Sequence, residues 1–74
     1  MEERSNVLNL IIERLNAMLG AKDYTEETKY ADIGMKSGNY SSMITVLEDE
    51  FDVEIPFMQF RRKATIGESV DYVC

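Results

Sequence analysis

Residues 37–51 read Ser37-Gly38-Asn39-Tyr40-Ser41-Ser42-Met43-Ile44-Thr45-Val46-Leu47-Glu48-Asp49-Glu50-Phe51. Apolar side chains recur in this stretch at steps of three and four residues, at Tyr40, Met43, Ile44, Leu47 and Phe51. That spacing places them on one face of an α-helix. The sequence therefore predicts an amphipathic helix over residues 38–51, with Ser37 or Asn39 as its N-cap.

A second helical pattern precedes this stretch. Over residues 7–19 the same spacing is kept by Leu8, Ile11, Ile12, Leu15, Met18 and Leu19. Ser5 is a suitable N-cap and Gly20 a suitable terminator, so we expect a helix between them. Residues 21–36 are mostly polar and lose the helical period. They predict a long structured loop with one short helical turn, and loops of this length are often functional.

The chain after residue 51 predicts two shorter helices. Pro56 pushes Ile55 away from helical geometry and so closes the connection that follows the central helix. Residues 57–62 form a short third segment. Thr65 and Glu68 match the Thr-x-x-Glu capping box that begins many helices. Behind it Ile66, Val70 and Val73 form the apolar stripe of a last short helix.

These elements predict an all-α protein, a small four-helix bundle of three main helices and one short helix, with a long loop between the first two. We expect a single domain over residues 1–74, because 74 residues cannot bury two cores. No disulfide framework is possible, since Cys74 is the only cysteine.

Composition excludes several classes of function. The chain has no histidine, so mechanisms that need imidazole and the common zinc sites are ruled out. We therefore expect a protein that is not an enzyme, with no catalytic residue and no metal site. Its 14 acidic and 8 basic residues give a net charge of −6. That charge argues against nucleic acid and favours partners with basic patches.

The N-terminal sequence gives an expectation about location. Residues 1–4 lack the basic and apolar regions of a signal peptide, and no apolar run is long enough to span a bilayer. We accordingly expect a cytoplasmic monomer without a membrane span.

Residues 48–54 hold five acids and no base. Glu48, Asp49 and Glu50 fall in the last turn of the central helix, where each carboxylate is unfavourable by about 0.3–1 kcal/mol because it adds to the negative pole. One interpretation is a solvated face that keeps the protein soluble. The other is a docking surface for cationic partners. The opposite charge is carried by Arg61, Arg62 and Lys63. We expect these bases at the end of the third segment, where cations are stabilised by the negative pole of a helix.

The segment Asp32-Ile33-Gly34-Met35-Lys36-Ser37-Gly38 leads into the central helix, which ends in Leu47-Glu48-Asp49-Glu50-Phe51. This arrangement resembles the acyl carrier protein family. In that family an Asp-Leu-Gly-x-Asp-Ser-Leu segment leads into a helix that ends in Leu-Glu-x-Glu-Phe. The similarity continues through Glu54-Ile55-Pro56, Ala64-Thr65-Ile66-Gly67 and Val70-Asp71-Tyr72-Val73, so that it covers residues 32–73.

The resemblance implies that Ser37 is esterified by 4′-phosphopantetheine, whose arm carries acyl groups as thioesters. It implies a phosphopantetheinyl transferase as one partner. Acyl-loading and acyl-transfer or synthase enzymes with basic patches, in fatty acid, polyketide or related biosynthesis, would be the others. A phosphate on Ser37 would meet the free N–H groups and the positive pole of the helix. Without the resemblance, a lone serine before a helix is an ordinary N-cap.

Two positions depart from the family pattern. The acid before the serine is Lys36, and the leucine after it is Gly38. The first change reverses the charge beside Ser37, and the second removes an apolar contact. Both changes favour a specialised carrier over a general one.

Candidate residues for partner docking and for an acyl pocket follow from the resemblance. The docking candidates are Lys36, Tyr40, Glu48, Asp49 and Glu50. The acyl-pocket candidates are Met43, Leu47, Ile55, Met58 and Ile66. The alternative hypothesis is an unmodified carrier-like interaction module, which binds a partner through the acidic end of the central helix and the segment that contains Phe57 and Phe60.

Overall fold

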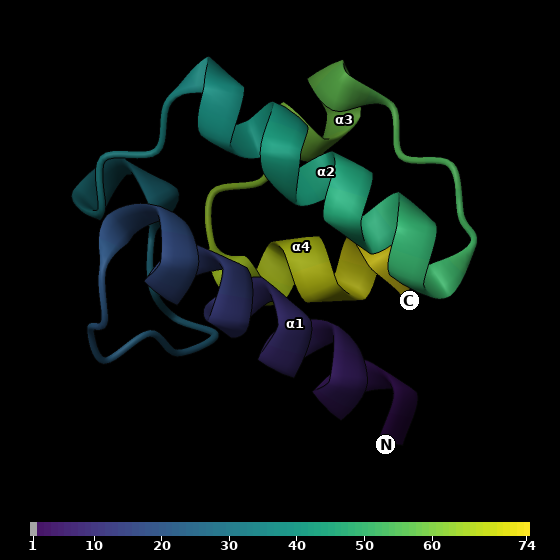
Figure 1. Ribbon diagram of the computed structural model, residues 1–74, viewed down its shortest axis with the longest axis horizontal. Coiled ribbons are helices and arrows are strands. Elements are labelled where there is room, and N and C mark those ends of the chain that lie inside the picture. Colours follow the sequence, from purple (N-terminus) through teal and green to yellow (C-terminus); the bar gives the residue numbers. More distant parts are fainter. Residues whose placement is uncertain (1) are drawn as a thin grey trace.

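The computed structural model describes residues 2–74, with the side chains of residues 3–74. Its helices are α1 (Glu2–Leu19), α2 (Ser37–Phe51), α3 (Phe57–Arg61) and α4 (Ile66–Val73), and a short 3-10 helix, η1 (Tyr30–Asp32), lies between α1 and α2. Figure 1 shows a small bundle of helices, with no strand among the residues described. The predicted all-α bundle is confirmed.

The predicted start of the first helix is wrong. Helix α1 begins at Glu2, so Ser5 lies inside the helix and not at its N-cap. Glu2 and Glu3 extend the helix because glutamate is a good helix former and an acid is stabilised near the positive pole. The end is as expected: Gly20 has a left-handed φ of 95°. Its N–H donates to the carbonyl of Asn16 at 3.1 Å.

One hydrophobic core joins the helices. In Figure 1, α1 lies against α2 and α4, and α3 lies against α2. The fully buried side chains of the core include Ile11, Leu15, Met43, Leu47, Phe60, Ile66 and Val70. The ring of Tyr40 contacts Tyr30 and Phe60 edge-on, at centroid distances of 5.4 and 6.3 Å. These contacts anchor η1 and the short α3 to the central helix.

The loop between α1 and α2 is long and structured, as predicted, and η1 is its short helical turn. Backbone hydrogen bonds hold it against the start of α4: Ile66 N–H donates to the carbonyl of Thr28 at 3.0 Å, and Gly67 N–H donates to that of Glu26 at 2.9 Å. In return, Tyr30 N–H donates to the carbonyl of Ala64 at 3.0 Å. The loop therefore satisfies N–H groups that the first turn of α4 would otherwise leave open.

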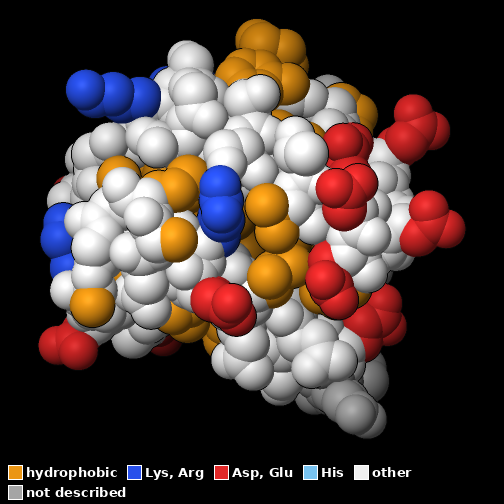
Figure 2. Space-filling model, viewed as in Figure 1, with side chains coloured by type: hydrophobic (Ala, Val, Ile, Leu, Met, Phe, Trp, Pro, Cys, Tyr) orange, Lys and Arg blue, Asp and Glu red, His pale blue; other side chains and the backbone are white. Residues whose placement is uncertain are grey.

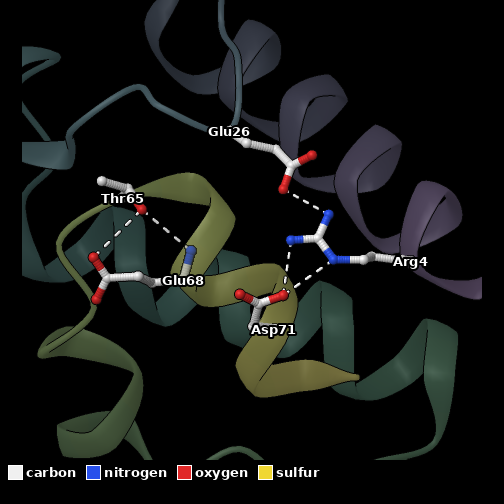
Figure 3. A network of polar contacts seen from close by, with 5 residues as sticks. All are labelled: Arg4, Glu26, Thr65, Glu68 and Asp71. Carbon is white, nitrogen blue, oxygen red and sulfur yellow. Dashed lines mark hydrogen bonds and ion pairs between the residues drawn. The ribbon is translucent and has the colours of Figure 1, made fainter.

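Helix α4 begins at the predicted cap. The hydroxyl oxygen of Thr65 accepts a hydrogen bond of 3.2 Å from Glu68 N–H. The carboxylate of Glu68 reaches back to the Thr65 hydroxyl and to Ala64 N–H, each at 3.4 Å. Figure 3 shows Thr65 and Glu68 turned toward each other at this end of the helix. This capping box differs from the usual one at one hydrogen bond: the Glu68 carboxylate accepts the N–H of Ala64 and not the N–H of Thr65.

Arg4 ties three segments together. Its guanidinium lies between Asp71 on α4 and Glu26 in the long loop (Figure 3). Nε and Nη2 of Arg4 donate to Oδ1 of Asp71 at 3.0 and 2.7 Å. Hydrogen bonds to Asp71 and Glu26 raise the pKa of Arg4, so the side chain stays charged. The ion pairs are partly exposed, and we regard them as orienting contacts more than as a large source of stability.

Candidate functional site

Ser37 is the first residue of α2, and its side chain is exposed. The N-cap position is occupied by Lys36, which has extended dihedral angles of −114° and 168°. Neither predicted N-cap holds that position. Asn39 acts from the third helical residue, where its Oδ1 accepts Lys36 N–H at 3.0 Å. The hydroxyl of Ser37 is therefore not used as a cap.

The approach to Ser37 is set by the turn before it. Gly34 has a left-handed φ of 74°, which glycine adopts without strain. The turn follows η1, where Ile33 N–H donates to the carbonyl of Tyr30 at 3.2 Å. This geometry brings the chain from the core, at Tyr30, to the surface at Ser37.

Open backbone donors surround the start of α2. The carbonyl of Lys36 accepts the N–H groups of Asn39 and Tyr40, at 2.9 and 3.1 Å. The N–H groups of Ser37 and Gly38 have no partner within the helix, because they belong to its first turn. A Cβ atom added at Gly38 would meet no heavy atom within 4 Å. The arrangement offers two donors, open space and the Lys36 cation to an anionic group on Ser37.

The acidic run has two parts that differ in role. Asp49 and Glu50 are exposed at the end of α2. Glu48 is half-buried, and its Oε2 accepts Ile55 N–H at 2.8 Å, so this carboxylate helps to hold the turn after the helix. Figure 2 shows acidic side chains gathered over the C-terminal end of α2 and the loop that follows. The structure thus brings Asp49 and Glu50 to the surface and engages Glu48 in the fold.

Tyr40 is not at the surface, where a docking residue would lie. Its side chain is 2% exposed, in the core. Burial raises its pKa, while the Arg61 guanidinium, 4.5 Å from the ring centroid, opposes that rise. The helical period of residues 40–51 already put Tyr40 on the apolar face. The docking assignment from the resemblance is therefore corrected: the side chain belongs to the packing between α2, η1 and α3.

The acyl-pocket candidates also include both buried and exposed side chains. Met43, Leu47, Ile55 and Ile66 are buried in the core. Met58 is 62% exposed, so its placement in an interior pocket is wrong. Helix α3 has only five residues and turns Phe60 inward, and a residue two positions earlier lies on the opposite side of a helix. Among the described residues, the four buried candidates do not line any of the three best-defined surface hollows.

The sequence analysis missed a cluster of four bases that the structure brings together. Lys29, Arg61, Arg62 and Lys63 line one groove together with Met35 and Tyr40. Arg61, Arg62 and Lys63 are consecutive in the sequence and were grouped there. Lys29 precedes α2, and nothing in the sequence indicated that it lies close to them. The backbone pairing of Lys29 with Thr65, and the hydrogen bond from Tyr30 N–H to the carbonyl of Ala64, bring them together.

Sequence comparison finds relatives that are named acyl carrier protein. Over 69 residues the chain is 29% identical to an acyl carrier protein of Wolinella succinogenes and 29% identical to one of Sulfurovum sp. strain NBC37-1. The alignments cover 92% of this chain and 88% and 89% of the two relatives. Both relatives are named acyl carrier protein, and their similarity supports an assignment of the chain to that family. No family model matches the chain, and no solved structure matches it.

The similarity to these relatives extends beyond the motif residues. An alignment of 69 residues must include most of α1 and the loop after it, in addition to residues 32–73. Acyl carrier proteins are carriers in general, which fits a role without catalysis. Among the described residues, no helix has the length and apolarity to cross a membrane. Within the same residues, no group of acidic or cysteine side chains has the geometry to hold a metal ion.

Proposed function

We propose that this chain carries acyl intermediates as thioesters on a 4′-phosphopantetheine arm attached to Ser37. The observation that supports this most directly is the position of Ser37, an exposed hydroxyl on the first residue of α2 that is not used as a cap. A phosphate attached there lies at the positive pole of a 15-residue helix. The relatives named acyl carrier protein add independent support.

The residues around Ser37 fit the group. Ser37 and Gly38 offer N–H donors, and Lys36 adds a cation beside the phosphate. When attached, the arm supplies a terminal thiol for thioester exchange. Attachment from coenzyme A forms a bond from Ser37 Oγ to phosphorus and breaks the bond to adenosine 3′,5′-bisphosphate. The serine proton goes to a base that the transferase supplies.

The proposal leaves the chemistry to partner enzymes of fatty acid, polyketide or related biosynthesis. Their basic patches would meet Asp49 and Glu50, which are exposed at the end of α2. We propose a monomer that works in the cytoplasm, where a reducing environment keeps the thiol of the arm free. Met43, Leu47, Ile55 and Ile66 stay the candidates for sheltering an acyl chain, which would have to displace part of the core packing.

Intact mass tests the attachment. Incubation with coenzyme A and a broad-specificity phosphopantetheinyl transferase should add the mass of one phosphopantetheine to the wild-type chain. Ser37→Ala should add nothing. Ser41→Ala is the matched control, because Ser41 is also an exposed serine of α2 and its loss should leave the mass gain unchanged. An unmodified wild-type chain with intact helical structure, even with its own dedicated transferase, contradicts the proposal.

A second candidate function rests on exposed apolar side chains near the acids. Phe57 and Met58 are 37% and 62% exposed on α3, while Phe60 is fully buried and unavailable to a partner. Together with Asp49 and Glu50 they favour an unmodified interaction module. This function predicts partner binding that survives Ser37→Ala and is lost in Asp49→Asn/Glu50→Gln. The control Asp23→Asn/Glu27→Gln removes the same charge from the exposed loop.

A further inference from the structure

A basic groove lies between η1 and the end of α3. It encloses about 380 Å³ and is lined by the cationic side chains of Lys29, Arg61, Arg62 and Lys63. Its apolar lining comes from Ala31, Met35 and Ala64, and from the rings of Tyr30 and Tyr40, which are buried beneath it. We propose that this groove docks an acidic segment of a partner protein, one that combines carboxylates with an apolar side chain.

The charge of the groove is opposite to that of the protein. Half of the eight bases of the chain line it, and none of its lining residues is acidic. The ion pairs found among residues 3–74 are those of Arg4, so none of the four groove cations is in an ion pair with a carboxylate of those residues. Lys63 also lines a second hollow, with Glu68 and Asp71, so Lys29, Arg61 and Arg62 are the cations that serve the groove alone. On a chain with a net charge of −6, such a concentration gives a local attraction for anions that the rest of the surface opposes.

Two of the cations are held in place by aromatic rings. The guanidinium of Arg61 lies 4.5 Å from the ring centroid of Tyr40, and Nζ of Lys63 lies 4.6 Å from that of Tyr72. Contacts of this kind attract the cation to the ring and so orient the side chain. A ligand that binds here therefore loses less side-chain entropy than one that must order free lysines and arginines.

The shape of the groove favours a protein segment over a lipid surface. A hollow with an apolar wall accepts an inserted side chain, while a flat membrane surface reaches only the rim. Two of the groove residues, Met35 and Tyr40, lie two and three positions from Ser37 in the chain. A partner bound there would approach the start of α2, whereas a basic partner would meet the acidic end, over which Figure 2 shows the acids gathered. The inference goes beyond the carrier function and does not require modification of Ser37.

Binding can be mapped on the Ser37→Ala chain, which cannot carry the arm. The probe is a synthetic five-residue peptide of four acidic residues around one phenylalanine, added to ¹⁵N-labelled protein. Amide shifts should be confined to the groove, at Tyr30, Met35, Tyr40 and residues 61–64, and should weaken as salt is raised. A peptide in which lysines replace the acids should leave these amides unshifted.

Two matched variants distinguish binding at the groove from a general effect of the net charge of the protein. Arg62→Glu should weaken peptide binding by about five-fold or more, while Lys22→Glu, an equal charge change at an exposed loop base, should change it by less than about two-fold. Equal effects of both variants, shifts elsewhere, or no shifts in a folded protein overturn the proposal. Anionic phosphatidylserine vesicles that bind in an Arg62-dependent way, without peptide binding, would also overturn it in favour of a membrane ligand. Because Ser37 is absent from every sample, failure here leaves the mass test of the carrier function unaffected.

Discussion

The hydroxyl of Tyr30 donates a hydrogen bond of 2.7 Å to Oγ of Ser69 inside the core. Tyr30 belongs to η1 and Ser69 to α4, and the two residues are 2% and 0% exposed. The ring of Tyr30 also packs edge-on against Tyr40 of α2. One side chain thus connects the loop that leads to Ser37 with two helices, which fixes the approach to the proposed attachment site.

Loss of the Ser69 hydroxyl should destabilise the protein. Ser69→Ala leaves the buried Tyr30 hydroxyl without its partner, which costs about 1–3 kcal/mol of unfolding free energy. Tyr30→Phe/Ser69→Ala removes both polar groups and should recover part of that loss. Urea unfolding of the wild type, both single variants and the double variant gives the coupling energy. Additive single effects would show that the hydrogen bond does not couple the two residues.

Stability should fall in alkaline solution. Burial raises the pKa of Tyr30 from its ordinary value of 10 to about 12, against the opposing hydrogen bond to Ser69. The folded protein favours the neutral phenol of Tyr30. Its contribution to the unfolding free energy is therefore complete below pH 10, the pKa at which this tyrosine ionises in the unfolded chain. It is lost as the pH rises through 12, and amounts to about 3 kcal/mol at most. Burial raises the pKa of Tyr40 as well, which acts in the same direction.

Urea unfolding between pH 9 and 12 measures this dependence. Tyr30→Phe should flatten the fall in unfolding free energy, because phenylalanine cannot ionise. Tyr72→Phe is the control, since Tyr72 is only partly buried, and should keep the wild-type dependence. A Tyr30→Phe chain that loses stability as steeply as the wild type would assign the alkaline transition to other groups.

Two glycines should respond in opposite ways to the same substitution. Gly38 is in the first turn of α2 with open space around it, so Gly38→Ala should stabilise the protein by about 0.4–1 kcal/mol. A Cβ atom at Gly67 would lie 3.0 Å from the carbonyl oxygen of Glu26, which already accepts Gly67 N–H. Gly67→Ala should therefore destabilise by about 1–3 kcal/mol. Thermal unfolding of the two variants gives the comparison, and equal signs would contradict the contact between the loop and α4.

The sequence predicted those parts of the fold that local patterns determine. The period of residues 40–51 identified α2 and its buried face, and the Thr65 cap located α4. The inward face of α3 was not predictable from spacing, because a five-residue helix is too short to show a period, and Phe60 rather than Met58 turned inward. The groove needed tertiary structure, because Lys29 and Arg62 are far apart in the chain. Ser37 itself was found through the motif, and the structure added that Lys36 is the N-cap.

Lys36 is the residue whose replacement links stability to the proposed function. A lysine side chain cannot accept the N–H groups of the first turn, and its charge opposes the positive pole of α2. Lys36→Asp supplies an acceptor and reverses the charge, so it should raise the unfolding free energy by about 1–2 kcal/mol. Lys36→Gln removes the charge without providing a good cap and should give a smaller gain.

The same pair of variants tests how a transferase recognises the site. If a general transferase requires an acid before the serine, modification of Ser37 should be fastest in Lys36→Asp and slowest in the wild type, with Lys36→Gln between them. The rate is measured by the intact mass over time, at one concentration of coenzyme A. If the wild-type chain is modified as fast as Lys36→Asp, the charge at position 36 does not affect the rate at which the enzyme modifies Ser37. The gain in stability would still be expected in that case, because it depends on the helix and not on the transferase.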